Sequence, residues 1–213
     1  MAYDLEEQEQ LATLKAWWAR WGNLVLGVIT LVLLAIAGWN GWNWYQREQA
    51  AKAGALYAEL EKAAGMNNTN VVKDSTKILL ERFGRTVYAP LAAFHAARLN
   101  HEANELTAAQ ENLQWVIDKS GRPEFVAIAR HRLAAVLLDA KQYDAALKLV
   151  EGDIPAEHVV AYADRRGDIL FAQGKVDDAR AAWQKALDSA DLQSPLRGLI
   201  QFKLDALPPV EKS

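Results

Sequence analysis

One long apolar stretch stands apart from the rest of the chain. Between Arg20 and Arg47 the sequence carries no charged residue, and most of the positions between them are aliphatic or aromatic. An α-helix rises about 1.5 Å per residue, so roughly 20 apolar residues cross the hydrocarbon core of a bilayer. The pattern therefore predicts three parts: a short acidic or amphipathic tail (1–20), a transmembrane helix (21–46) and a soluble region (47–213).

Aromatic residues mark both ends of this stretch. Six of the eight tryptophans of the chain flank it. Indole rings prefer the headgroup level of a bilayer, so paired aromatic belts are typical of a true membrane span. The predicted membrane-interface residues are Trp17, Trp18, Trp21, Trp39, Trp42, Trp44 and Tyr45.

Two other interpretations of the stretch are a buried core helix and a cleaved signal peptide. A core helix rarely has so many uninterrupted apolar residues. A signal peptide has a basic start and an apolar core of about 7–15 residues. Here four acidic residues precede Lys15, and the small residues at 35–37 that resemble a cleavage site are followed by a second aromatic belt. The pattern favours an uncleaved anchor.

Charge does not decide the orientation of the predicted span. The positive-inside rule counts Lys and Arg close to each end. Lys15 and Arg20 precede the span, and Arg47, Lys52 and Lys62 follow it. This difference is too small to choose a side, so the topology stays open on charge alone.

The tail and the span each carry one further open feature. Leu11, Leu14 and Trp18 follow helical spacing, so the tail either lies in the membrane interface or simply extends the membrane helix. Ala37 and Gly41 form a small-xxx-small pair, which permits close approach of a second helix but is also common by chance.

The soluble region shows helical periodicity throughout and no alternating strand pattern. Apolar residues recur at intervals of three and four, alanine and leucine dominate, and prolines are sparse. We expect helices over about 47–64 and 71–83, and a last helix over 195–207. The expected breaks between helices lie at 67–70, Gly84, 120–123, 152–155, 173–175 and 194–195, with Pro123, Pro155 and Pro195 in first turns.

A repeat emerges when these breaks are aligned. Three segments share a first helix, a tight polar turn and an alanine three residues after an apolar position. These alanines, Ala109, Ala146 and Ala179, are 37 and 33 residues apart. A period near 34 is typical of tetratricopeptide helix–turn–helix repeats. Close crossing of the two helices requires a small residue, so we predict an all-α solenoid with the last helix as a solvating cap.

Composition and motifs argue against several functions. The soluble region is close to neutral, which argues against nucleic acid as a partner. The chain has no cysteine and no nucleotide-binding or nucleophile motif, and its four histidines lack metal-ligand spacing. We therefore expect no catalytic residues, no metal, no cofactor and no enzymatic activity.

The repeats resemble the tetratricopeptide consensus, although its initial Trp is missing. The last repeat has Gly167, Leu170, Gly174, Ala179, Trp183 and Ala186 at consensus positions. An acidic, aromatic-flanked span followed by divergent hairpins of this type resembles the YfgM family over nearly the whole chain. That resemblance implies a single-span bacterial inner-membrane protein with a cytoplasmic N-terminus and residues 47–213 in the periplasm. It also implies an ancillary subunit of the SecYEG translocon that works with a membrane-anchored periplasmic chaperone of the prolyl-isomerase class.

Binding is the remaining role for the repeats. Alignment to the family places one face of each first helix on a concave groove that would accept a partner segment and, in addition, emerging client chains. Phe94, Leu138 and Phe171 would give apolar contacts, while Arg98, Asp164 and Asp168 would select polar partners. The full predicted set is Leu91, Phe94, Arg98, His101, Ile128, His131, Ala135, Leu138, Ala161, Asp164, Asp168 and Phe171.

Two alternatives accompany this prediction. The same residues could instead pack against the next hairpin, because core packing takes up most aromatic residues in small solenoids. The chain could also be a structural scaffold of another envelope complex, of cell division or secretion, that shares only the architecture. A cluster of Lys and Asn that would clamp a free C-terminal carboxylate is missing, so capture of a chain end is not expected.

Overall fold

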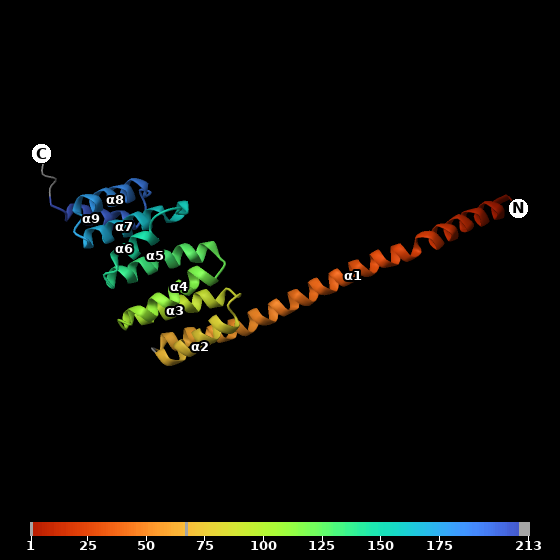
Figure 1. Cartoon of the computed structure of the whole chain (residues 1–213), viewed down its shortest axis with the longest axis horizontal. Coiled ribbons are helices and arrows are strands. Elements are labelled where there is room, and N and C mark those ends of the chain that lie inside the picture. The colour runs from red at the N-terminus through yellow and green to blue at the C-terminus, as the bar shows by residue number, and fades with distance from the viewer. Residues whose placement is uncertain (1, 67, 209–213) are drawn as a thin grey trace. The chain divides into compact units, whose positions relative to one another are not determined.

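The computed structural model confirms the predicted all-α fold. It describes residues 2–66 and 68–208, and these contain helices and no strand (Figure 1). The helices are α1 (Ala2–Gly65), α2 (Thr69–Arg82), α3 (Tyr88–Glu102), α4 (Leu106–Lys119), α5 (Pro123–Asp139), α6 (Tyr143–Leu149), the 3₁₀ turn η1 (Ala156–His158), α7 (Val159–Ala172), α8 (Val176–Ser189) and α9 (Leu196–Asp205).

The chain divides into two compact units, Met1–Gln49 and Ala50–Ser213. Helix α1 contributes to both, since it continues without a break from Ala2 to Gly65. The separate helix expected from about residue 47 is therefore the last part of α1. The predicted tail is helical in the same way, which agrees with the alternative that it extends the apolar helix.

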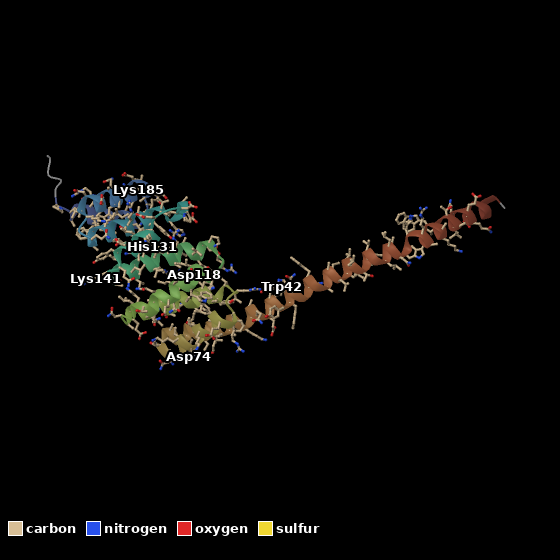
Figure 2. All side chains as sticks on the ribbon, in the orientation of Figure 1. Trp42, Asp74, Asp118, His131, Lys141 and Lys185 are labelled. Carbon is tan, nitrogen blue, oxygen red and sulfur yellow. The ribbon has the colours of Figure 1, made fainter. Side chains whose placement is uncertain are left out.

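Within the described residues, α1 is the one helix that is long and apolar enough to cross a membrane. Its aliphatic and aromatic side chains project outward around the helix, Trp42 among them (Figure 2). The hydroxyl of Thr30, in the middle of this stretch, is satisfied internally, because its Oγ1 donates to the carbonyl of Leu26 at 2.8 Å. A helix pairs its own backbone polar groups, and one that also exposes apolar side chains is suited to lipid.

The second unit is a row of helical hairpins, α3 with α4, α5 with α6 and α7 with α8 (Figure 1). All three hairpins turn in the same way. The central turn residues Asn104, Lys141 and Gly174 have φ of 60°, 59° and 78°. In each turn the next residue donates its N–H to the carbonyl five positions earlier, as Lys175 does to Leu170 at 3.0 Å. The repeat predicted from alanine spacing is thus a repeat of backbone geometry as well.

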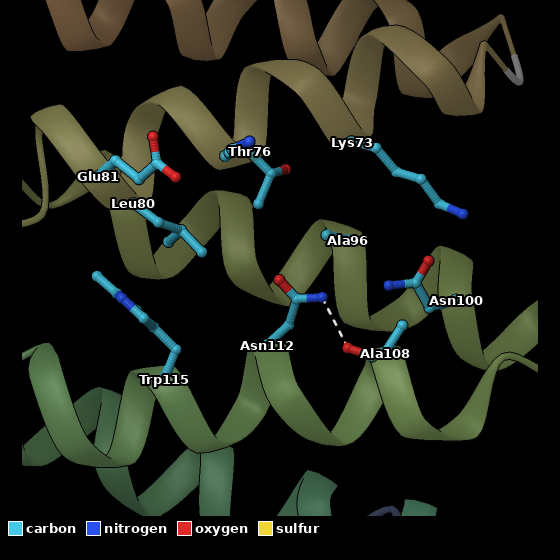
Figure 3. A pocket seen from close by; sticks show the side chains of 10 residues that line it. Lys73, Thr76, Leu80, Glu81, Ala96, Asn100, Ala108, Asn112 and Trp115 are labelled. Carbon is cyan, nitrogen blue, oxygen red and sulfur yellow. Dashed lines mark hydrogen bonds between the residues drawn. The ribbon is translucent and has the colours of Figure 1, made fainter.

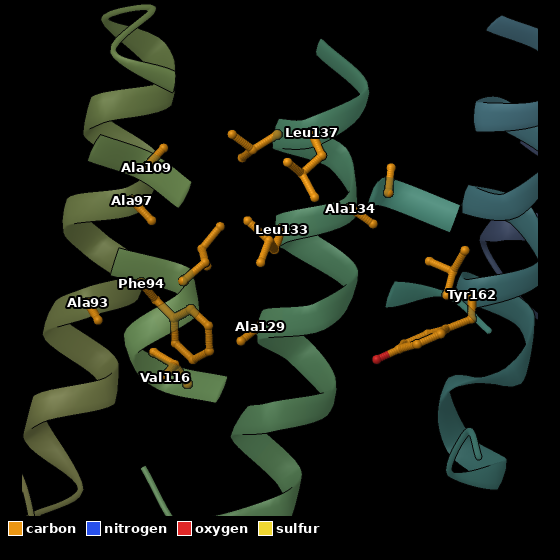
Figure 4. Close-up of a cluster of buried hydrophobic side chains, with 14 of the residues drawn as sticks. Ala93, Phe94, Ala97, Ala109, Val116, Ala129, Leu133, Ala134, Leu137 and Tyr162 are labelled. Atoms are coloured by element: carbon orange, nitrogen blue, oxygen red, sulfur yellow. The ribbon is translucent and has the colours of Figure 1, made fainter. Parts of the chain in front are cut away.

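The anchoring alanines lie where the two helices of each hairpin cross. Ala109, Ala146 and Ala179 are each 0% exposed. Figure 4 shows Ala109 beside Ala97 on the facing helix, within the largest buried cluster. Small side chains at these positions allow the helix backbones to approach, as the sequence predicted.

Replacing one of these alanines by a larger residue should destabilise the fold. We expect Ala146→Leu to lower the free energy of unfolding by about 1–3 kcal/mol, because the added atoms have no space in a close-packed crossing. The neighbouring Ala145 is exposed and provides the control, so Ala145→Leu should change stability by less than about 0.5 kcal/mol. Urea unfolding of the full chain in detergent measures both. Equal effects of the two substitutions would contradict the crossing geometry.

A further hairpin precedes the three predicted ones. The last part of α1 packs on α2 and α3 through a separate cluster that includes Ala53, Leu60 and Val72. Tyr57 and Tyr88 contact there with ring centroids 5.6 Å apart. The sequence analysis expected both helices and the break at 67–70, but it did not recognise them as a further hairpin of the row, because this polar break differs from the other turns.

The second hairpin is irregular. Helix α6 has only 7 residues. The segment after it is held by Arg130, whose guanidinium donates to the carbonyls of Leu149 at 3.1 Å, Glu151 at 2.8 Å and Asp153 at 3.4 Å. One side chain therefore satisfies backbone oxygens that a longer helix would have paired internally.

The last helix closes the row, with differences from the expected cap. Ile200 is fully buried on its inner side. The helix begins after Pro195, which precedes it instead of forming its first turn. Its outer side exposes Leu199 by 49% and Phe202 by 71%, so it is not the polar, solvating cap that we expected.

Candidate partner-binding groove

A groove of about 370 Å³ lies between the first helices of the three hairpins, α3, α5 and α7. Its apolar lining comes from Phe94, Ala97, Leu113, Ala135 and Val136, and its polar lining from Arg98, His101, His131, Arg132 and Arg165. Five predicted residues are thus brought together: Phe94, Arg98, His101, His131 and Ala135. Arg132 and Arg165 were not predicted.

The floor of the groove is also part of the core. Phe94 is largely buried and meets Phe125 edge to face, with ring centroids 6.1 Å apart. Leu113 and Val136 belong to the same buried cluster. The groove therefore has a rigid apolar base, since its residues are fixed by packing on both sides.

The rim carries charge on helices from different repeats. Arg98 pairs with Glu102 at 3.1 Å on the same helix. His101 reaches across to Asp139 of α5, with Nε2 and Oδ2 2.6 Å apart. Only the His101–Asp139 contact joins α3 to α5, since the Arg98–Glu102 pair lies within α3. Both pairs are exposed, so their contribution to stability is small.

Two arginines line the wall toward the next repeat. The Arg132 guanidinium lies over the Phe94 ring, 4.7 Å from its centroid. Arg165 pairs with Asp168 at 3.2 Å, and its Nε is buried without an acceptor. A helix-face alignment finds His131 but not Arg132, because adjacent residues of a helix point about 100° apart and only the long side chain of arginine bridges that difference.

His131, which is labelled in Figure 2, lines the groove in its neutral form. Burial, with the positive charge of Arg165 nearby, lowers its pKa to about 4. Its ring lies 5.8 Å from that of Tyr162, whose hydroxyl donates to the Ala127 carbonyl at 2.7 Å and ties α7 to α5. Protonation of His131 would place a second cation beside Arg165.

This environment predicts a loss of stability on acidification. The folded pKa of His131 is below the unfolded value of 6.5, so its contribution is complete above pH 6.5 and is lost as the pH falls toward 4. Between pH 7 and 4.5 the free energy of unfolding should fall by about 2 kcal/mol less in His131→Gln than in wild type. Urea unfolding of both proteins at pH 7 and at pH 4.5 measures this difference, and His101→Gln serves as a control at an exposed position. Parallel pH profiles for wild type and His131→Gln would contradict this.

The predicted acidic residues are engaged elsewhere. Lys203 of α9 lies 2.6 Å from a carboxylate oxygen of Asp164 and of Asp168. The Trp183 indole donates to the Asp164 carbonyl at 3.1 Å and to the Asp168 carboxylate at 3.3 Å. Both charges are therefore neutralised within the chain, and neither residue lines the groove.

The remaining predicted residues are spread over the same helices. Phe171 is 50% exposed, and its ring centroid lies 5.7 Å from that of Trp183. Leu91 and Leu138 are half-buried, and Leu138 packs against the main core. Phe171 is thus available to a partner beyond the groove, while Leu138 follows the packing alternative.

A second hollow of about 500 Å³ lies between α2, α3 and α4 (Figure 3). It contains the buried polar residues Thr76 and Asn100, with Trp115 at one end. Asn112 faces it but donates to the Ala108 carbonyl at 2.8 Å. The sequence analysis did not predict this hollow, because it depends on the unrecognised first hairpin. No group of three potential metal ligands occurs among the described residues.

Comparison with known proteins identifies the family. A family model described as a tetratricopeptide repeat-like domain matches residues 15–209. A Neisseria gonorrhoeae protein called ancillary SecYEG translocon subunit is 30% identical over 208 residues, 97% of this chain and 100% of that protein. This chain belongs to the YfgM family. The resemblance noted in the sequence is thereby confirmed.

Other YfgM relatives align over similar lengths. The protein of the same name from Escherichia coli K12 is 30% identical over 202 residues, 94% of this chain and 96% of that protein. That from Haemophilus influenzae is 28% identical over 193 residues, 89% of this chain and 92% of the relative. No solved structure matches the chain. Ancillary translocon subunits with a tetratricopeptide repeat-like fold are not a class of enzymes.

Proposed function

We propose that this chain is a single-span inner-membrane adaptor that associates with the SecYEG translocon. Its relatives carry that association in their names, and α1 supplies a helix long and apolar enough to anchor it. The N-terminus lies in the cytoplasm and residues 47–213 lie in the periplasm. The repeat domain links the translocon to a membrane-anchored chaperone of the prolyl-isomerase class and meets emerging client chains.

The observation that carries the adaptor role is the groove between α3, α5 and α7. It combines an apolar base with charged residues from three repeats, as expected of a surface that binds an extended or helical protein segment. Phe171, exposed on α7, adds an apolar contact next to it. Leu91, Phe94, Arg98, His101 and His131 remain the proposed contact residues, and the seven interfacial aromatic residues the proposed membrane contacts.

The orientation can be tested with single cysteines, since the sequence has none of its own. Gln8 and Lys185 are both exposed. With Lys185→Cys, a membrane-impermeant maleimide should label the protein in intact spheroplasts, and with Gln8→Cys only after lysis. The reverse pattern would reject the proposed orientation and, with it, contact with periplasmic chaperones.

The partners can be tested by crosslinking in native membranes. A photoreactive phenylalanine analogue at Phe171 keeps the aromatic ring at an exposed position, whereas Phe94 is too buried to serve. We expect adducts with translocon subunits or a periplasmic chaperone, identified by mass spectrometry. The same analogue at Leu192, an exposed position outside the groove, is the control. Adducts with division or secretion components alone would favour the scaffold alternative.

A further inference from the structure

The groove between α3, α5 and α7 has an unbalanced set of charged residues. Its lining includes three arginines and no carboxylate. Two of the arginines are occupied, Arg98 by Glu102 and Arg165 by Asp168. Asp168 is shared with Lys203, so it only partly compensates Arg165. The charge that remains free in the groove is positive.

Arg132 is the free cation. Among the described residues no hydrogen bond or ion pair involves its guanidinium, which lies over the face of the Phe94 ring, 4.7 Å from the ring centroid. Partial burial lowers the pKa of this guanidinium, which remains charged. Arg132 is an exposed residue of the groove lining, so its guanidinium is accessible to an anionic group of a partner.

The contact with Phe94 also restrains Arg132. A cation over an aromatic ring interacts with the ring face and does not use up its N–H groups, which stay available as hydrogen-bond donors. The edge of a guanidinium forms a planar fork that fits the two oxygens of a carboxylate. Phe94 is fixed in the core, so the fork is held in place before a ligand arrives.

A second unsatisfied donor lies on the same wall. The Nε of Arg165 is buried and has no acceptor, although its Nη1 is bound to Asp168. Below the two arginines the groove is apolar, with Leu113, Ala135 and Val136. An occupant that satisfies this surface needs an anionic group for the wall and an apolar side chain for the base.

We propose that the groove binds a segment of a partner protein in which an aspartate or glutamate stands within a few residues of a bulky apolar residue. Arg132 binds the carboxylate through its free edge, and the apolar side chain packs on Leu113 and Val136. This inference rests on the proposed adaptor function, because it specifies what the groove of such an adaptor recognises. The near-neutral charge of the whole chain favours one local carboxylate contact over a polyanion.

The test uses the full chain in native membranes, with a small diazirine amino acid at Ala135 as the probe. Irradiation should give a protein adduct, and mass spectrometry should place the crosslink within three residues of an Asp or Glu. Arg132→Gln should lower the adduct yield at least tenfold, and Arg132→Lys, which keeps the charge but not the fork, at least threefold. Arg166→Gln removes an exposed arginine outside the lining and should stay within twofold of wild type.

A charge exchange completes the test. Replacing the mapped acidic residue of the partner by arginine should restore the adduct in Arg132→Glu and abolish it in wild type. An adduct that is unchanged in Arg132→Gln, or adducts with lipid alone, would overturn the inference. If Ala135 gives no protein adduct while Phe171 still crosslinks to the translocon, the groove inference fails and the adaptor function stands. If neither position crosslinks, both fail.

Discussion

Adding a single methyl group at Gly167 should cost about 3 kcal/mol of unfolding free energy. A Cβ built there would lie 2.4 Å from Cδ1 and Nε1 of the Trp183 indole, closer than real contacts allow. Trp183 is almost fully buried, so the ring cannot move away without opening the core of the last hairpin. Its displacement would also break the bond from Nε1 to the Asp164 carbonyl.

Gly198 is the control for Gly167→Ala. It lies in α9 and a Cβ there meets nothing within 4 Å. Since alanine has the higher helix propensity, Gly198→Ala should leave stability unchanged or raise it by up to about 1 kcal/mol. Thermal unfolding followed by circular dichroism compares the two. A Gly167→Ala protein as stable as wild type would show that α7 and α8 are less closely packed than described.

Removing the charge of Lys203 should cost about 3 kcal/mol at neutral pH. Its ammonium neutralises Asp164 and Asp168, whose side chains are 11% and 19% exposed. In Lys203→Met these two carboxylates share only Arg165, and an uncompensated buried charge is strongly destabilising. Lys185→Met, at an exposed position, is the control and should change stability by less than about 0.5 kcal/mol.

The cost of Lys203→Met should depend on pH. Burial raises the pKa of Asp168 above its ordinary value, and Lys203 opposes that rise. Without Lys203 the pKa of Asp168 in the folded chain rises further above its value in the unfolded chain. Protonation of Asp168 on acidification therefore stabilises the folded state of the variant. The deficit should therefore shrink between pH 7 and 4.5 in urea unfolding. Adding Asp164→Asn, which leaves Asp168 paired with Arg165, should recover part of the stability at pH 7, and a deficit that does not vary with pH would contradict this account.

The sequence predicted the parts of the fold that depend on local patterns. The alanine at the crossing of each hairpin follows from helical spacing, and the aromatic-flanked apolar stretch follows from composition. Both helices of the first hairpin were expected, but they were not recognised as part of the row, because residues 50–65 continue the membrane helix without a break and no turn marks where the repeats begin.

The candidate site was only partly predictable for a different reason. Helix-face periodicity identifies positions such as Phe94 and His131, but it does not show which oppositely charged residue pairs with a given charged side chain. Asp164 and Asp168 were expected in the groove, yet Lys203, 39 and 35 residues later, binds both. Arg132 could have been found only by knowing that Phe94 lies beneath it, which is a contact between repeats.

The short helix α6 has a consequence for motion. Native proteins open in cooperative segments whose free energies differ, and a segment with few helical hydrogen bonds opens first. Here the segment after α6 depends on the three bonds of Arg130, at the centre of the row. Hydrogen exchange should therefore be fastest around residues 143–155 among the repeats. We expect the row to bend at this segment, and such bending would change the width of the groove.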